Sequence, residues 1–169
     1  MKLTTSQSDL SAALATVRSA VQSGRPSHPI LATVLLTATP GTLSLACFDL
    51  KTSIQTTIAA QVAVEGAAAV PYALLAPLVA KLPAQAAVTI AASGDRIVLA
   101  TVSGEYSLTA LNAADWPETI EPKAADAVTV PLVDLQAAIT ATAHAASRDE
   151  AKQVLQGIRI ALAADGIPA

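Results

Sequence analysis

The chain has 169 residues, a formal net charge of −3 and a hydrophobic content of 53%, which suffices for one core and, within residues 1–120, for an independent domain. Aromatic residues make up only 2% of the chain, which argues against a stacking platform for single-stranded nucleic acid. The net charge neither selects nor excludes DNA as a partner, because an acidic protein can carry a local basic surface.

A first helix is predicted over residues 10–21. Ser8 or Asp9 is the expected N-cap, and Gly24 is expected to end the helix before the loop that begins at Arg25. The apolar residues of this segment follow the spacing of one helical face, at Leu10, Leu14, Val17 and Val21.

Three strands are predicted after this loop, over residues 30–38, 42–48 and 52–64. The last of these segments alternates apolar and polar residues, as a half-buried strand does. The dipeptide Pro40-Gly41 is typical of a turn, so the first two strands are expected to form a hairpin.

A second strand-to-helix step begins at Val70-Pro71. It leads into a predicted helix over residues 72–81, which Pro83 closes. Strands are then predicted over residues 87–92, 96–102 and 105–111. Residues 1–120 as a whole therefore predict the order β-α-β-β-β twice. The two helices are expected to pack as a pair on one face of antiparallel sheet, which is an α+β fold.

The chain then repeats its own beginning. A segment rich in proline and acidic residues, without clear periodicity, predicts a linker over residues 121–127. The repeat pairs Ser8–Leu14 with Val133–Ile139 and Ile30–Leu36 with Val154–Ile160. A repeat whose two copies lie so far apart in the sequence indicates duplicated domains rather than a short repeat.

The second unit, residues 128–169, is expected to hold a strand over 128–130, a helix over 132–144 and a strand over 154–162. Nothing after Asp165 supplies the hairpins, second helix and closing strands of the first unit. We therefore expect this unit to be the incomplete start of a second domain, and either to be marginally stable or to pack as an appendage.

The chain offers few residues for catalysis. His28 and His144 do not lie in a spacing typical of metal ligands, Cys47 has no cysteine partner, and no glycine-rich phosphate loop is present. We therefore expect no enzyme activity, no metal site and no cofactor. Cys47 is interpreted as a small buried hydrophobic residue, His28 as a solvated loop residue and His144 as a partner of a helix dipole.

Two further observations concern location. No export signal is recognisable at the N-terminus, and a single cysteine permits no disulfide within the chain. The most apolar window, residues 66–80, is interrupted by Pro71 and Pro77 and is shorter than the roughly 20 residues that span a bilayer. A cytoplasmic protein is the expectation.

Basic residues recur at equivalent helix ends. Arg18 and Arg25 flank the end of the first predicted helix, Lys81 ends the second, and Arg148 and Lys152 follow the third. One interpretation is that they complement helix dipoles and favour solubility. The other is a shared surface that binds phosphates without reading bases.

Four ordered motifs resemble a known family. They are Ser-Gly-Arg-Pro-Ser-His-Pro-Ile-Leu-Ala at 23–32, Gly-Thr-Leu-Ser-Leu-Ala-Cys-Phe-Asp-Leu at 41–50, Gly-Glu-Tyr-Ser-Leu at 104–108, and Ala-Ala-Asp-Trp-Pro at 113–117. In this order they closely resemble the N-terminal domain of the bacterial DNA polymerase III beta subunit.

This resemblance implies a sliding clamp, a non-enzymatic processivity factor. Subunits of that family form a homodimeric ring of three similar domains each, which encircles double-stranded DNA and tethers DNA polymerase III after a clamp loader has placed it. Helices line the hole of the ring and sheets form the outside. The duplication in this chain corresponds to the first and second domains of such a subunit.

The resemblance also implies two sets of site residues. The first should contact the DNA backbone nonspecifically, and comprises Arg25, Lys81, Arg148, Lys152 and Gln153. The second lies on the edge strand that joins the first domain to the third domain of the partner subunit, and comprises Glu105, Tyr106, Ser107 and Leu108.

The sequence is therefore interpreted as a truncated sliding-clamp subunit, with a complete first domain, a linker and the start of the central domain. The alternative is a non-ring-forming interaction module or a decayed clamp fragment, which would act on an intact clamp through its exposed edge strand. Heterodimer formation with an intact clamp distinguishes an interaction module from an inert fragment.

Overall fold

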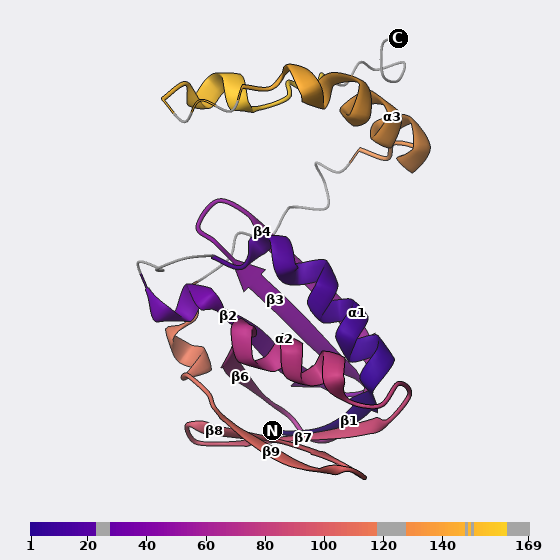
Figure 1. Cartoon of the computed structure of the whole chain (residues 1–169), viewed down its shortest axis with the longest axis vertical. Helices are drawn as coiled ribbons and strands as arrows, with labels where there is room; N and C mark the ends of the chain where they lie inside the picture. Colours follow the sequence, from indigo (N-terminus) through magenta and orange to yellow (C-terminus); the bar gives the residue numbers. More distant parts are fainter. Residues whose placement is uncertain (23–27, 118–127, 148, 150, 162–169) are drawn as a thin grey trace. The chain divides into compact units, whose positions relative to one another are not determined.

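The computed structural model describes the chain apart from residues 23–27, 118–127, 148, 150 and 162–169 (Figure 1). The chain divides into two compact units, Met1–Thr119 and Ile120–Ala169, which are described separately. The first unit ends close to the predicted domain end at residue 120, and the predicted linker over 121–127 lies outside the described residues. None of the described helices is both long and apolar enough to cross a membrane.

The first unit follows the predicted β-α-β-β-β order twice, with one short strand, β5, between the two halves (Figure 1). The first half contains β1 (Lys2–Ser6), α1 (Gln7–Val17), β2 (Thr33–Thr39), β3 (Thr42–Phe48) and β4 (Ser53–Ala59). The second half contains β6 (Gly66–Pro71), α2 (Tyr72–Lys81), β7 (Ala87–Ser93), β8 (Arg96–Thr101) and β9 (Gly104–Thr109).

The strands form two antiparallel sheets, where the sequence indicated only antiparallel sheet. One sheet has the order β5-β1-β7-β8-β9 and the other the order β4-β3-β2-β6. Each strand-helix-strand step of the sequence therefore carries the chain from one sheet to the other, since β1 and β2 lie in different sheets and so do β6 and β7. The helix of the first step is α1, and the helix of the second step is α2.

The strand predicted over residues 52–64 is wrong as a single element, because the chain changes sheets at Ala60. It divides into β4 and β5 (Gln61–Val64), which belong to different sheets. Two hydrogen bonds hold this crossing: the Ala60 N–H donates to the Gly41 carbonyl at 3.1 Å, and the Thr5 hydroxyl donates to the Ala59 carbonyl at 3.0 Å.

The first helix begins earlier than predicted. Its N-cap is Ser6, whose Oγ accepts a hydrogen bond from the Asp9 N–H at 3.1 Å and donates one to the Asp9 carboxylate at 2.7 Å. Ser8 and Asp9 are therefore inside the helix, and neither is the cap. The α-helix also ends at Val17, and a 3₁₀ turn over Arg18–Ala20 replaces the predicted last turn.

The start of the strand predicted over residues 30–38 is also wrong. Pro29–Ala32 forms a 3₁₀ helix, and β2 begins only at Thr33. Proline lacks an N–H and has a φ that suits the first helical position. The Thr33 hydroxyl then donates to the Ile30 carbonyl at 2.6 Å, which closes the turn.

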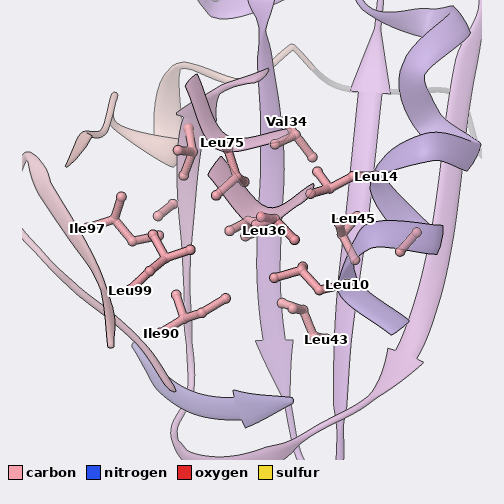
Figure 2. Packing of buried hydrophobic residues seen from close by; sticks show 14 of the residues in the cluster. Leu10, Leu14, Val34, Leu36, Leu43, Leu45, Leu75, Ile90, Ile97 and Leu99 are labelled. Carbon is pink, nitrogen blue, oxygen red and sulfur yellow. The ribbon is translucent and has the colours of Figure 1, made fainter. Parts of the chain in front are cut away.

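One aliphatic core joins both helices to both sheets (Figure 2). Leu10 and Leu14 enter it from α1 and Leu75 from α2, and all three are fully buried. The sheets contribute residues such as Leu36, Leu43, Leu45, Ile90, Ile97 and Leu99. Cys47 is buried in the same core, as predicted, and burial raises the pKa of its thiol to about 12.

The second unit contains α3 (Leu132–Thr142), which matches the predicted helix over 132–144 apart from its last turn. That turn is a 3₁₀ helix over Ala143–Ala145, and a further 3₁₀ helix covers Gln153–Gln156. The strands predicted over 128–130 and 154–162 are wrong within the described residues. A strand needs a hydrogen-bonded neighbour, and the described part of this unit provides none.

Burial predicts unequal effects for two neighbouring leucines of α2. Leu75 is 0% exposed and Leu74 is 53% exposed. We expect Leu75→Ala to lower the free energy of unfolding of the first unit by about 2–5 kcal/mol, and Leu74→Ala by less than about 0.5 kcal/mol. Urea unfolding followed by the fluorescence of Trp116, the single tryptophan of the chain, measures both. Equal losses would contradict the assigned core.

Candidate nucleic-acid interface

The helices α1 and α2 run antiparallel, and two hydrogen bonds show this directly. The side-chain amide of Gln7, at the start of α1, donates to the Val79 carbonyl near the end of α2 at 2.9 Å. The hydroxyl of Tyr72, at the start of α2, donates to the Leu14 carbonyl near the end of α1 at 3.1 Å. Each helix therefore begins beside the end of the other.

The middle of the exposed side of this helix pair is built from uncharged and mostly small side chains. The apolar residues that face the core leave the opposite side of each helix open to solvent. On α1 the exposed residues of the middle and last turns are Ala12, Ala15 and Thr16, and on α2 they are Ala73, Leu74, Pro77 and Ala80. A flexible or charged side chain would limit how closely another surface approaches, and these residues do not.

Cations lie at opposite ends of the pair. Arg18 follows the last residue of α1, Lys81 is the last residue of α2, and both side chains are exposed. A helix rises about 1.5 Å per residue, so antiparallel helices of this length separate their C-terminal ends by on the order of 15 Å. Arg18 and Lys81 are therefore placed for separate phosphates rather than for one shared anion.

The end of the helix pair that holds Lys81 also carries an acidic side chain. Asp9 is exposed in the first turn of α1, at the end of the pair where Lys81 lies. Its carboxylate is already engaged by the Ser6 hydroxyl. Lys81 also complements the carbonyl end of its own helix, so the dipole interpretation and the phosphate interpretation of this residue are compatible.

The predicted DNA-binding residues are only partly visible in the described part of the chain. Arg25 and Arg148 lie outside it. Lys81 is in the first unit. Lys152 is exposed in the second unit, where its N–H donates to the Asp149 carbonyl at 3.1 Å just before the 3₁₀ helix that begins at Gln153.

The predicted interface strand is a sheet edge. Strand β9 pairs with β8 and is the last strand in the order of its sheet. Tyr106 and Leu108 stand opposite the buried Leu99 and Ile97, so they face the core side of the sheet. Glu105 and Ser107 alternate with them and face outward. The free edge of such a strand carries backbone N–H and C=O groups available to another strand.

Other candidate chemistry is weak in the described residues. His28 and His144 are exposed, and no group of three or more His, Cys, Asp or Glu side chains there is arranged to hold a metal ion. A shallow groove of about 490 Å³ at the end of β1 contains hydroxyl and amide side chains but no titratable residue. The raised pKa of the buried Cys47 thiol keeps it protonated at neutral pH.

Comparison with known proteins identifies the family. Residues 1–120 match the model of the DNA polymerase III beta subunit, N-terminal domain. The chain belongs to this family. The resemblance predicted from the sequence motifs is thereby confirmed.

Curated relatives of this beta-subunit family carry the name beta sliding clamp. The chain is 38% identical to that of Synechococcus elongatus over 169 residues, which is 99% of the chain and 45% of the relative. It is 35% identical to that of Synechocystis over 175 residues, covering 99% of the chain and 44% of the relative. The chain therefore spans less than half the length of these relatives.

Solved structures of the family have the same fold. The DNA polymerase sliding clamp of Caulobacter crescentus matches with a TM-score of 0.84 at 33% identity, over 93% of this chain and 43% of that chain. A sliding clamp of Bartonella birtlesii, DNA polymerase III subunit beta, matches with a TM-score of 0.90 at 25% identity, over 98% of this chain and 44% of that chain. The predicted α+β clamp fold is confirmed.

Sequence reasoning missed the two residues that join the helices of this beta-subunit domain, Gln7 and Tyr72. A signal was present, because each is the first residue of its helix and precedes a leucine three positions later, Leu10 and Leu75. Both leucines are fully buried. A polar residue that continues a buried helical face needs a hydrogen-bond partner.

If the helix pair of this beta-subunit domain faces DNA, its two cations contribute to phosphate binding. We expect Arg18→Gln and Lys81→Gln each to weaken binding to a labelled duplex at low salt, and to reduce the slope of log K against log salt by about 0.9 for each phosphate that the variant no longer neutralises. Fluorescence anisotropy over a salt series measures both quantities.

Lys2→Gln is the matched control. Lys2 is exposed on β1, where it alternates with the buried Leu3 and so lies on the outer side of the sheet. The slope should be unchanged in this variant. Equal slopes of log K against log salt in all three variants would show that neither Arg18 nor Lys81 contacts DNA phosphates.

Proposed function

We propose that this chain forms part of a DNA sliding clamp, the non-catalytic processivity subunit of bacterial DNA polymerase III. In the complete ring it encircles duplex DNA and tethers the polymerase. The observation that carries the proposal is the family match over residues 1–120. The TM-scores of 0.84 and 0.90 against solved sliding clamps support it.

The exposed side of the helix pair suits a surface that slides. Its middle is small and uncharged, so it offers no side chain for reading base edges, which requires hydrogen-bonding groups in a groove. The cations at its ends favour the phosphate backbone, which is the same for every sequence. We assign this role to Arg25 and Lys81 in the first unit and to Arg148, Lys152 and Gln153 in the second.

The proposal assigns no chemical step and no cofactor to the chain. A ring that holds DNA acts by enclosing it, so no bond is made or broken. The proposed partners are double-stranded DNA, DNA polymerase III, the clamp loader and a second subunit in a homodimeric ring. Replication of bacterial DNA places this function in the cytoplasm.

Ring closure is assigned to the free edge of β9. Glu105, Tyr106, Ser107 and Leu108 lie on this strand, which has a paired neighbour on one side only, β8, among the described strands. The same edge favours the second candidate function, a non-ring-forming module that pairs with an intact clamp. The two candidates differ in whether the edge closes a ring around DNA.

A chimeric subunit tests the proposed function. Residues 1–120 of this chain would replace the matching N-terminal domain of the Synechococcus elongatus beta sliding clamp. We expect the chimera to dimerise and, once loaded, to stay on nicked circular DNA while it slides off linear DNA, because a closed ring has no end to leave on a circle. Gel filtration of protein–DNA complexes measures this retention.

Two substitutions serve as variant and control. Tyr106→Lys places a charge on the core side of the edge strand, which disfavours edge pairing, so retention on the circle should be lost. Thr37→Lys adds the same charge on the outer side of β2, an internal strand of the other sheet, and should retain the ring. A chimera that dimerises but leaves circular and linear DNA equally fast would contradict the clamp function. A folded chimera that stays monomeric would favour the interaction module.

A further inference from the structure

The two hydrogen bonds between α1 and α2 are equivalent by position. Gln7 is the first residue of α1 and Tyr72 the first residue of α2. In each helix the carbonyl that receives the partner's hydrogen bond, at Leu14 or Val79, lies about two turns after that first residue. The helix pair is therefore joined by a reciprocal pair of bonds, one at each end.

One of the two bonds shares its acceptor with the backbone of α2. The Val79 carbonyl also accepts the Leu82 N–H at 3.2 Å, so the Gln7 amide uses the second lone pair of this oxygen. The Gln7 side chain is only 7% exposed, so its amide cannot turn to bulk solvent instead. Loss of the Val79 contact therefore leaves the Gln7 amide buried without a hydrogen-bond partner.

Two bonds at opposite ends constrain the pair more than either bond alone. A single bond would allow one helix to pivot about that end. A slide of one helix along the other lengthens both bonds together, and a hydrogen bond tolerates only about half an ångström of stretch. One helical turn is about 5.4 Å, so no shifted register restores both bonds.

We propose that Gln7 and Tyr72 are positioning residues, which fix the axial register of α1 against α2 and thereby the spacing of Arg18 and Lys81 on the exposed side of the pair. The register itself rests only on the geometry of the helix pair. Its consequence for DNA rests on the proposed function.

Tyr72 provides a probe of this register. Burial raises the pKa of its phenol, nearby Arg18 opposes the rise, and the Cys47 thiol adds to it. These groups belong to the end of the pair opposite Gln7. A change in the Tyr72 pKa that is caused by a substitution at Gln7 must therefore pass along the helix contact.

The experiment uses the Tyr106→Phe background, in which Tyr72 is the only tyrosine of the chain, since the chain has 2. Ultraviolet absorbance then follows phenolate formation with pH. We expect Gln7→Met, which has similar length but no donor, to lower the Tyr72 pKa toward the ordinary value for tyrosine, because the loosened contact lets water reach the phenol. The phenolate cannot donate, so the Tyr72 bond is lost above that pKa.

Thr16→Val is the matched control. The Thr16 hydroxyl donates to the Ala12 carbonyl at 3.0 Å, within α1, so its loss removes a side-chain hydrogen bond without touching the contact between the helices. The Tyr72 pKa should be unchanged in this variant. A shift in Thr16→Val as large as that in Gln7→Met would reduce the effect to general loosening and would overturn the proposal.

A reciprocal variant keeps the test decisive if Gln7→Met does not fold. In Tyr72→Phe, the side-chain amide protons of Gln7 should exchange with solvent severalfold faster, as measured by nuclear magnetic resonance. An unchanged Tyr72 pKa in folded Gln7→Met, or unchanged Gln7 exchange in folded Tyr72→Phe, would show that each bond acts alone and would overturn the proposal.

The duplex-binding assay with a salt series separates this inference from the proposed function. We expect Gln7→Met to reduce the slope of log K against log salt. Gln55→Met, which removes the same kind of amide from the exposed side of β4, where Gln55 donates to the Ser44 hydroxyl at 3.0 Å, should leave the slope unchanged. A shifted Tyr72 pKa with an unchanged slope would overturn the link between register and phosphate spacing. Absence of DNA binding by the unsubstituted chain would contradict the proposed function, and the tyrosine titration would still decide the register.

Discussion

The burial of one helix pair against two sheets is the interaction on which the first unit depends. The sheets have separate strand ladders, and backbone hydrogen bonds at Ala60 and at the bridge between Ala69 and Leu111 join the described parts of the two sheets. The aliphatic side chains of α1 and α2 fill the space between the sheets (Figure 2). With few aromatic residues available, close packing of Leu, Ile, Val and Ala must supply the stabilisation.

This packing also determines what the unit presents outside. Because most large side chains of both helices are used in the core, mainly small residues and Leu74 remain on the opposite side, with Arg18 and Lys81 at the two ends. Because the sheets use their inner residues in the same core, their edges stay free for pairing with another sheet. The helix side proposed for the DNA backbone and the strand edge proposed for a neighbouring subunit therefore follow from one arrangement.

Much of this fold was predictable where local patterns are strong. The helix at Tyr72–Lys81 and the strand at Thr42–Phe48 have the predicted bounds, because Pro71, Pro83 and the Pro40-Gly41 turn mark their ends. Two of the errors occur where tertiary contacts decide the structure. The break at Ala60 depends on which sheet each strand joins, and the strand expected after Val154 lacks a neighbour among the described residues.

The candidate site was predictable to a similar extent. The position of Lys81 at a helix end was predictable from the sequence pattern, and the resemblance to the family implied that the strand at Glu105–Leu108 is an edge strand. The hydrogen bonds of Gln7 and Tyr72 were not predictable, because they join residues far apart in sequence and depend on the antiparallel packing. The most direct test of the whole account is amide chemical-shift mapping of the isotopically labelled chain with a short duplex at low salt. Shifts concentrated on exposed residues of α1 and α2, such as Thr16 and Ala80, are the predicted result. Shifts on the outer sides of the sheets instead, or none at all, would contradict it.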